Sequence, residues 1–320
     1  MTRRDLVRAG AGLFALNAGW GAAGKPLRGI FPIAQTPFAA DGSLDLDVLV
    51  KQLEFIHRGG VHGFVWPQLA SEWSTLTESE RLAGAEALAG AGKKLKPAVV
   101  IGVQGADAAS AERYAKHAAK IGADAVIALP PPGDKSEEAI LAYYERIGRA
   151  SDLPLFVQAV GMMSVEFVLK LWKTVPTLKL IKDEAGEPLM RVGRLRSESR
   201  DEIKVFTGGH GRTLIDEMAR GTSGTMPAAS FADLYASVWD QWQAGKRKEA
   251  MEMFGRTLLL VTEVQVYGVE SLKYVLELRG VFRNHKGRTQ AGLESRGRLD
   301  DAGRAVLREM VDYLRPWFRA

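Results

Sequence analysis

The residue with the clearest chemical potential in this sequence is Lys182, which follows the nearly apolar run Leu178-Lys179-Leu180-Ile181 without a break. Such a run is typical of a strand buried on both faces of a parallel sheet. Burial disfavours the charged form of a lysine, and a neutral amine can attack a carbonyl carbon to form an imine. The alternative is a structural lysine paired with Asp183 or Glu184. Position alone does not separate the two interpretations.

Three other groups could transfer protons or bind an anion. His210, in Gly208-Gly209-His210-Gly211, carries an imidazole suited to proton transfer, although an ordinary exposed loop histidine is the alternative. The same glycines could instead bind an anion through backbone N–H groups. Glu72 is a second proton-transfer candidate, with a structural role at a helix start as its alternative. Glu184 is expected to lie past the end of its strand, and we assign it no catalytic role.

Eight short apolar runs recur from residue 29 onward and predict buried parallel strands, and helix-period segments separate them. Thr77 with Glu80 predicts a capping box at the start of one such helix. This alternation favours a closed (β/α)₈ TIM barrel, in which the active site lies at the C-terminal ends of the strands. The expected strands are Ile30–Ile33, Gly63–Trp66, Ala98–Ile101, Ala125–Leu129, Leu155–Val157, Leu178–Ile181, Lys204–Phe206 and Thr222–Met226.

The pattern changes after the eighth strand, where four helical segments follow one another with no strand between them. We therefore expect a barrel over residues 26–230 and a C-terminal helical domain over residues 231–320, packed against it. The expected helices are Phe231–Ala244, Lys246–Thr262, Val269–Gly280 and Ala302–Phe318.

Residues 1–25 are treated separately from the fold. Arg3 and Arg4 precede a mildly apolar stretch rich in alanine and glycine, which resembles a twin-arginine export signal. The stretch is too short and glycine-rich for a stable membrane span. We therefore expect a periplasmic protein, with a disordered tail and a cytoplasmic location as the alternative.

Composition excludes several kinds of chemistry. The chain has no cysteine, so thiol catalysis, disulfides and cysteine metal sites are excluded. Its five histidines are scattered, which argues against a histidine-based metal site. The net charge of +5 lies mostly near the two ends and is not interleaved with aromatic residues, so we expect no nucleic-acid partner. We also expect neither a cofactor nor a bound metal.

The segment Ile181-Lys182-Asp183-Glu184-Ala185-Gly186 resembles the Schiff-base lysine motif of the dihydrodipicolinate synthase / N-acetylneuraminate lyase superfamily. The resemblance covers most of the chain, because further motifs follow in the family's order. They are Gly29–Phe38 with its Thr-Pro-Phe turn, Asp41–Asp45, Gly122–Ala125, Gly221–Gly224 and Gly245–Ala250.

This resemblance implies a (β/α)₈ barrel with a C-terminal helical domain, often as a homo-oligomer such as a dimer or tetramer. It also implies a class I aldolase, lyase or dehydratase that acts on pyruvate or a related 2-oxo acid. Lys182 would be the imine-forming residue.

The chain departs from the family at several functional positions. The loop that holds the 2-oxo acid carboxylate falls on Gln68-Leu69-Ala70-Ser71-Glu72, so the backbone of Ala70 and Ser71, the Ser71 hydroxyl and Glu72 are the expected contacts. The proton-relaying tyrosine of strand five falls on Gln158, an amide that does not titrate near neutrality. With Gly208, His210 and Met226 at the last two strand ends, these residues form the predicted site.

Two more departures bear on the reaction. The tyrosine lent by a neighbouring subunit falls on Pro131 or Pro132, and the arginine for a distal carboxylate falls near Met162 and Met163. The leading prediction is therefore a Schiff-base lyase that is not a lysine-pathway synthase. The alternatives are a weakened barrel that binds a 2-oxo acid or another small anion without turnover, and a phosphate-substrate enzyme using Gly208–Gly211.

Overall fold

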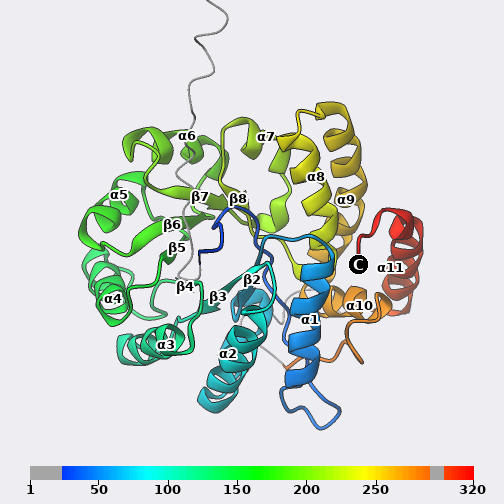
Figure 1. Ribbon diagram of the computed structural model, residues 1–320, viewed down its shortest axis with the longest axis horizontal. Helices are drawn as coiled ribbons and strands as arrows, with labels where there is room; N and C mark the ends of the chain where they lie inside the picture. The colour runs from blue at the N-terminus through cyan, green and yellow to red at the C-terminus, as the bar shows by residue number, and fades with distance from the viewer. Residues whose placement is uncertain (1–23, 289–298) are drawn as a thin grey trace, which may run out of the picture.

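The chain folds into a parallel eight-stranded barrel surrounded by helices, as the sequence predicts (Figure 1). The computed structural model describes residues 24–288 and 299–320. The paired Arg3 and Arg4 therefore lie outside the described residues. The strands are β1 (Gly29–Ile30), β2 (Gly63–Trp66), β3 (Ala98–Gly102), β4 (Ala125–Ala128), β5 (Leu155–Ala159), β6 (Leu178–Asp183), β7 (Lys204–Thr207) and β8 (Gly224–Thr225).

The sheet runs β1-β8-β7-β6-β5-β4-β3-β2, and each strand is parallel to its neighbours in this order. Backbone contacts between the two end strands close it. Ile33 bridges Val65, and the Ala34 N–H donates to the Val65 carbonyl at 2.9 Å. The first and last strands are shorter than expected because the chain leaves regular pairing after Ile30 and Thr225, although Ile33 still bridges Ala228.

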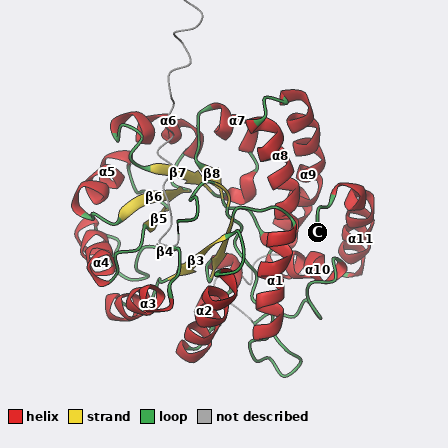
Figure 2. Cartoon of the chain, in the orientation of Figure 1, coloured by secondary structure: helices red, strands yellow, loops and turns green. Residues whose placement is uncertain are grey.

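Helices follow the strands and form a ring around them (Figures 1 and 2). The capping box predicted at Thr77 and Glu80 is present, and Gly122 ends its helix with a left-handed φ of 78°. The ring consists of α1 (Leu46–Arg58), α2 (Glu78–Gly92), α3 (Ala108–Ile121), α4 (Glu137–Ala150), α5 (Val165–Thr174), α6 (Pro188–Glu198), α7 (Leu214–Ala219) and α8 (Ala232–Gln243).

Three further helices lie outside the ring, on the side of α8 (Figure 1). They are α9 (Arg247–Tyr267), α10 (Val269–Leu278) and α11 (Asp301–Leu314). All four late helices predicted from the sequence are present, but α9 continues to Tyr267, past its expected end at Thr262. Because α8 contacts β1 and completes the ring, it belongs spatially with the barrel. The division into units at residue 230 stays a prediction.

The barrel interior is filled by aromatic side chains below the strand ends. Phe31, Phe156 and Phe206 are fully buried, and the Phe206 ring lies edge-on to the other two with centroids 5.1 and 5.2 Å away. Because side chains alternate across a strand, residues two positions beyond Phe156 and Leu180 also point inward, one layer higher. Those residues are Gln158 and Lys182.

Candidate active site

Lys182 lies on the inward face of β6, directly above Leu180 of the inner core. Lys182 is only 6% exposed, and it pairs in register with Gln158 on β5. Both faces of β6 are apolar around Lys182, because Leu180 belongs to the inner core whereas Leu178 and Ile181 pack into the outer hydrophobic cluster. Strand alternation therefore carries the Lys182 side chain into the mouth of the barrel.

Sequence reasoning named Glu184 only as a possible ion-pair partner of Lys182 and did not include it among the site residues. β6 continues to Asp183, two residues past its expected end at Ile181, and Glu184 lies beyond the strand as expected, but its carboxylate turns into the mouth and lies 3.0 Å from the Lys182 Nζ. The Glu184 N–H donates to the Ala159 carbonyl at 2.9 Å, so the chain continues to follow β5 for one residue after the strand. Asp183, the other proposed partner of Lys182, points outward and pairs with Arg191 at 2.8 Å.

Two donors and one glycine hold the Glu184 carboxylate in place. Gln158 donates from Nε2 at 2.5 Å, and the Gly209 N–H donates to the other oxygen at 2.9 Å. A Cβ added at Gly208 would lie 1.9 Å from Glu184 Oε1, so only glycine leaves room there. Burial alone would raise the pKa of Glu184, but Lys182, Gly209 and Gln158 together hold that pKa below its ordinary value.

The hydroxyl groups of Ser71 and Thr36 hold the loop after β2 in place through hydrogen bonds. Ser71 Oγ donates to the Ala34 carbonyl at 2.5 Å and accepts from the Gln68 N–H at 3.0 Å, while the Ser71 N–H donates to the Gln68 carbonyl at 2.9 Å. Thr36 Oγ1 donates to the Ser71 carbonyl at 2.5 Å. The polar groups of Ser71 therefore serve the loop itself.

Ala70 and its neighbour Leu69 do line the cavity. Among the described residues, neither of their N–H groups has a hydrogen-bond acceptor. The backbone N–H groups of this loop that face the cavity without an acceptor among the described residues are thus those of Leu69 and Ala70, one position earlier than the expected Ala70 and Ser71.

Glu72 occupies a left-handed backbone conformation (φ 56°) between two short 3₁₀ turns, Leu69–Ser71 and Trp73–Thr75. Its carboxylate forms a buried ion pair with Lys273 of α10 and accepts from the Arg288 N–H at 2.7 Å. Burial raises the pKa of Glu72 and lowers the pKa of Lys273, and each effect is opposed by the partner's charge.

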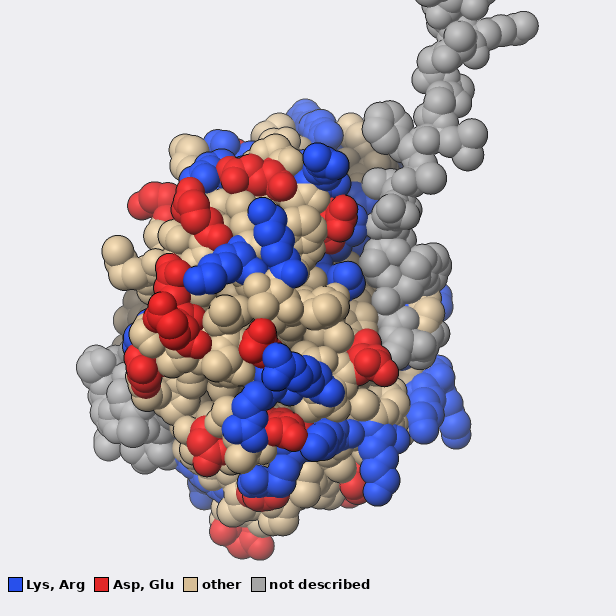
Figure 3. All heavy atoms as spheres, turned by 90° about the vertical axis from the view of Figure 1, so that its left-hand side faces the viewer, with Lys and Arg blue, Asp and Glu red and all other residues tan. Residues whose placement is uncertain are grey.

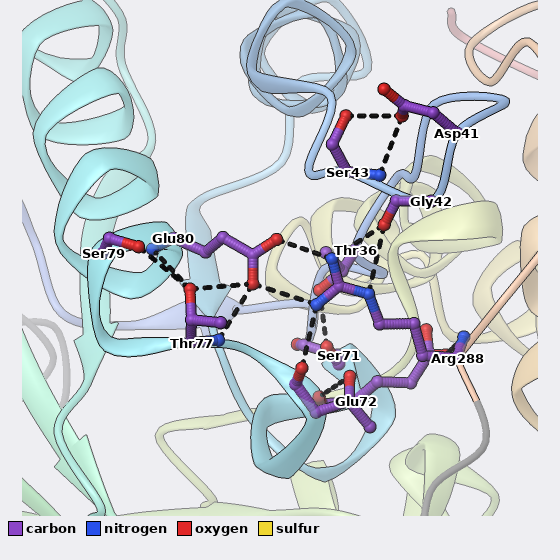
Figure 4. A network of polar contacts seen from close by, with 11 residues as sticks. Thr36, Asp41, Gly42, Ser43, Ser71, Glu72, Thr77, Ser79, Glu80 and Arg288 are labelled. Atoms are coloured by element: carbon purple, nitrogen blue, oxygen red, sulfur yellow. Dashed lines mark hydrogen bonds and ion pairs between the residues drawn. The ribbon is translucent and has the colours of Figure 1, made fainter.

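Arg288 fastens the segment 285–288 over this loop (Figure 4). Its guanidinium donates to both carboxylate oxygens of Glu80, at 2.6 and 2.9 Å, and to the Gly42 carbonyl at 2.7 Å. The Arg288 hydrogen bond holds the pKa of Glu80 at about 2. The arginine thus joins the capping box of α2 to the loop that follows the Thr-Pro-Phe turn.

His210 and Met226 line the cavity from the ends of β7 and β8. His210 is half-buried with a left-handed φ of 59°, and its carbonyl accepts from the Tyr235 hydroxyl at 2.5 Å. Met226 is 2% exposed and belongs to the inner core. Gly208 does not line the cavity, and of the neighbouring glycine amides, that of Gly209 is taken by Glu184.

These groups surround one cavity of about 970 Å³ at the C-terminal ends of the strands. The α9–α10 junction and the segment 285–288 form its outer wall, so the late helices contribute directly to it. Of the predicted residues, Lys182, Ala70, Glu72, His210 and Met226 line it, while Gln158 contacts it through Glu184.

Within residues 24–288 and 299–320, no cluster of three or more histidine, aspartate or glutamate side chains could hold a metal ion, and no helix is long and apolar enough to cross a membrane.

Lys273 is the second residue missed from sequence. It shares the apolar stripe of its helix with Val269, Leu272 and Leu276, at i, i+3, i+4 and i+7 spacing. The position of a lysine on such a stripe could have predicted that its side chain is buried and paired with an acidic group. The sequence could not identify Glu72 as the partner, because the two residues lie far apart along the chain.

Comparison with known proteins places these features in a family. Residues 26–295 match the model of the dihydrodipicolinate synthetase family. A DapA-like lyase of Thermococcus kodakarensis is 28% identical over 79% of this chain and 90% of its own length. The 4-hydroxy-tetrahydrodipicolinate synthase of Rhizobium meliloti is 28% identical over 79% of this chain and 88% of its own. Dihydrodipicolinate synthase from Rhodopseudomonas palustris superposes with a TM-score of 0.79 at 27% identity, covering 92% of this chain and 97% of that one.

Proposed function

Because this chain belongs to the dihydrodipicolinate synthetase family, we propose that it is a Schiff-base-forming lyase or aldolase acting on pyruvate or a related 2-oxo acid. The observation that carries this proposal is Lys182 itself. Its amine lies 3.0 Å from a carboxylate, on the inner face of β6, beside a cavity at the strand ends. Barrel enzymes use that end of the strands for catalysis.

The cavity offers a place for each part of a 2-oxo acid. The Lys182 amine would attack the carbonyl carbon, and the Leu69 and Ala70 N–H groups would hold the carboxylate. Ser71 and Thr36 would support that loop through its backbone rather than contact substrate. A phosphate cradle at Gly208–Gly211 is less favoured because the Gly209 N–H already binds Glu184.

The imine is tested by incubating the protein with pyruvate, reducing with borohydride and locating the adduct by mass spectrometry. We expect one reduced pyruvyl group on Lys182 and none in Lys182→Ala. The matched control is Lys179→Ala, which removes an exposed lysine from the same strand and should leave the adduct intact. An unmodified wild-type protein, or an adduct that survives in Lys182→Ala, would exclude the imine.

The chain is proposed not to be a lysine-pathway synthase. The relay tyrosine of the family falls on Gln158, and the distal arginine falls near Met162, whose side chain points into solvent at 98% exposure.

Gln158 also favours a second candidate function, a barrel that forms the imine but releases no product. A panel of 4-hydroxy-2-oxo acids, with aspartate semialdehyde plus pyruvate as one arm, separates these functions. Pyruvate release from the panel supports the lyase, silence supports the binder, and consumption of the semialdehyde would restore the synthase.

A further inference from the structure

Imine chemistry at Lys182 needs a group that moves protons, and this inference rests on the proposed function. The amine must lose protons while it attacks, and the carbonyl oxygen must gain them before it leaves as water. The strand-five position that stands in register with Lys182 carries Gln158, and an amide neither gains nor loses a proton near neutrality. The proton carrier must therefore be found elsewhere in the cavity.

We propose that Glu184 is the acid and base of imine formation and hydrolysis, and that Gln158 positions it. Glu184 Oε2 lies 3.0 Å from the Lys182 Nζ, which is within the reach required for direct proton transfer. The Glu184 side chain is 26% exposed and lines the cavity, so it can also reach an atom of bound substrate. Glu184 contacts the reacting nitrogen directly, whereas Gln158 contacts Glu184.

The surroundings of Glu184 fit a base that must keep one orientation. Gln158 binds the same oxygen that faces Lys182, and the Gly209 N–H binds the other oxygen. Gly208 supplies the space for the carboxylate, since any Cβ there would overlap it. Gln158 and Gly209 also stabilise the charged carboxylate, which is the form that accepts a proton from the ammonium.

Two other acidic side chains of this region are paired with cations other than Lys182. Glu72 is paired with Lys273 and bound by the Arg288 N–H. Asp183 faces Arg191 on the outside of the barrel. His210 lines the cavity from the 3₁₀ turn Gly209–Gly211 after β7, and its backbone carbonyl accepts from the Tyr235 hydroxyl. Of these side chains, Glu184 is the one that forms an ion pair with the Lys182 amine.

The proton transfers balance with this one carboxylate. Glu184 takes a proton from the Lys182 ammonium, and the amine lone pair forms a bond to C2 while the carbonyl π pair moves to oxygen. Protonated Glu184 returns the proton to that oxygen, then takes a second proton from the bound nitrogen. It delivers this proton to the hydroxyl, the C–O bond breaks, and water leaves as the nitrogen lone pair forms the C=N bond. One ammonium and one carbonyl become one iminium and one water, and Glu184 ends as the carboxylate it was.

The test measures the rate at which pyruvate is trapped on Lys182 by borohydride, sampled over time and analysed by mass spectrometry. We expect Glu184→Gln to form the same adduct on the same lysine at least about 100-fold more slowly, the range lost with a general acid–base. Glu187→Gln is the matched control, since it makes the same change at an exposed glutamate three residues on and should trap at the wild-type rate. Thermal unfolding of both variants verifies that they are folded.

A second variant separates proton transfer from mere support. Glu184→Ala leaves a space beside Lys182 that formate can enter, so its trapping rate should rise with formate concentration. The same formate should not accelerate Glu184→Gln, in which the amide fills that space.

Each outcome decides the proposal. A Glu184→Gln rate within threefold of wild type would overturn it, and so would a slow Glu184→Ala that formate does not accelerate. In both cases an adduct on Lys182 would leave the proposed lyase standing. No adduct in the wild-type protein would overturn the lyase and this role together.

Discussion

Lys182 and Glu184 both reach the cavity, but for different physical reasons. Lys182 points inward because residues alternate across β6, and Asp183 points outward to Arg191 by the same rule. Glu184 lies past the strand, so no alternation positions it. Hydrogen bonds from Gln158 and Gly209 do so instead. At this scale, the charge of Lys182 is balanced by a carboxylate that its strand pattern does not predict.

Glu217 carries a prediction about pH and stability. Its carboxylate is buried and accepts hydrogen bonds from Thr207 and Thr213, with no cationic partner among the described residues. Burial raises the pKa of Glu217 to about 7. Between its unfolded value near 4.5 and about 7, the unfolded chain has lost the proton while the folded chain keeps it. The free energy of unfolding should therefore fall as pH rises through this window, by about 3 kcal/mol.

Glu217→Gln should remove this slope because an amide does not titrate. We expect the variant to gain stability relative to wild type between pH 5 and pH 8, as measured by urea unfolding at both values. Comparing the two proteins at each pH cancels contributions from all other groups. A difference in stability that is the same at pH 5 and pH 8 would show that Glu217 titrates normally.

At the scale of elements, one ion pair joins the loop after β2 to helix α10. The Glu72 carboxylate contacts Lys273, whose side chain is fully buried, and the Lys273 Nζ also donates to the Lys286 carbonyl at 3.1 Å. The same loop is held by Arg288 from the segment that follows α10 (Figure 4). The barrel mouth and the late helices are therefore coupled through buried charge.

Breaking this pair on one side should cost more than removing it entirely. We expect Lys273→Met to lower the free energy of unfolding by about 3–5 kcal/mol, because the Glu72 carboxylate stays buried without its partner. Glu72→Gln should lower the free energy of unfolding by a comparable amount, because the Lys273 ammonium then stays buried without its partner. The double variant should recover much of the loss, since no charge then remains unpaired. Urea unfolding of all four proteins in a double-mutant cycle measures the coupling, and simple additivity of the two losses would refute it.

At the scale of the whole molecule, the C-terminus returns to the barrel. Arg279, the residue that follows α10, forms a buried pair with Asp233 of α8 at 2.7 Å and donates to the Ala320 carbonyl, while the Arg319 N–H donates to Asp233. Acidic and basic side chains are interspersed over the face that carries α4 and α5 (Figure 3). Assembly into a dimer or tetramer stays a prediction.

Export is the prediction that concerns the chain's route through the cell. Residues 1–28 fused to a folded reporter should carry it across the bacterial inner membrane, because the twin-arginine route accepts folded cargo and reads the arginine pair. Arg3→Lys/Arg4→Lys should abolish that export while preserving charge. Reporter activity in the periplasmic fraction measures both fusions, and equal export of the two would exclude this route.

The sequence by itself determined the barrel and the lysine. Both follow from local regularities: apolar runs of strand length, helix caps such as Thr77 with Glu80, and motifs in the family's order. The inward orientation of the Lys182 side chain follows from the alternation of residues along one strand. These features depend on residues that are neighbours along the chain, so their pattern is visible without coordinates.

Only the tertiary structure decided what surrounds the lysine. Glu184 reaches it because Gln158 and Gly209, from two other strand ends, hold the carboxylate there. Glu72 meets Lys273 because α10 returns across the mouth of the barrel. Such contacts join residues far apart in sequence, and their geometry depends on how the whole chain closes. The pattern along the chain therefore determined which lysine lies at the mouth of the barrel, whereas the packing between elements determined which carboxylate lies beside it.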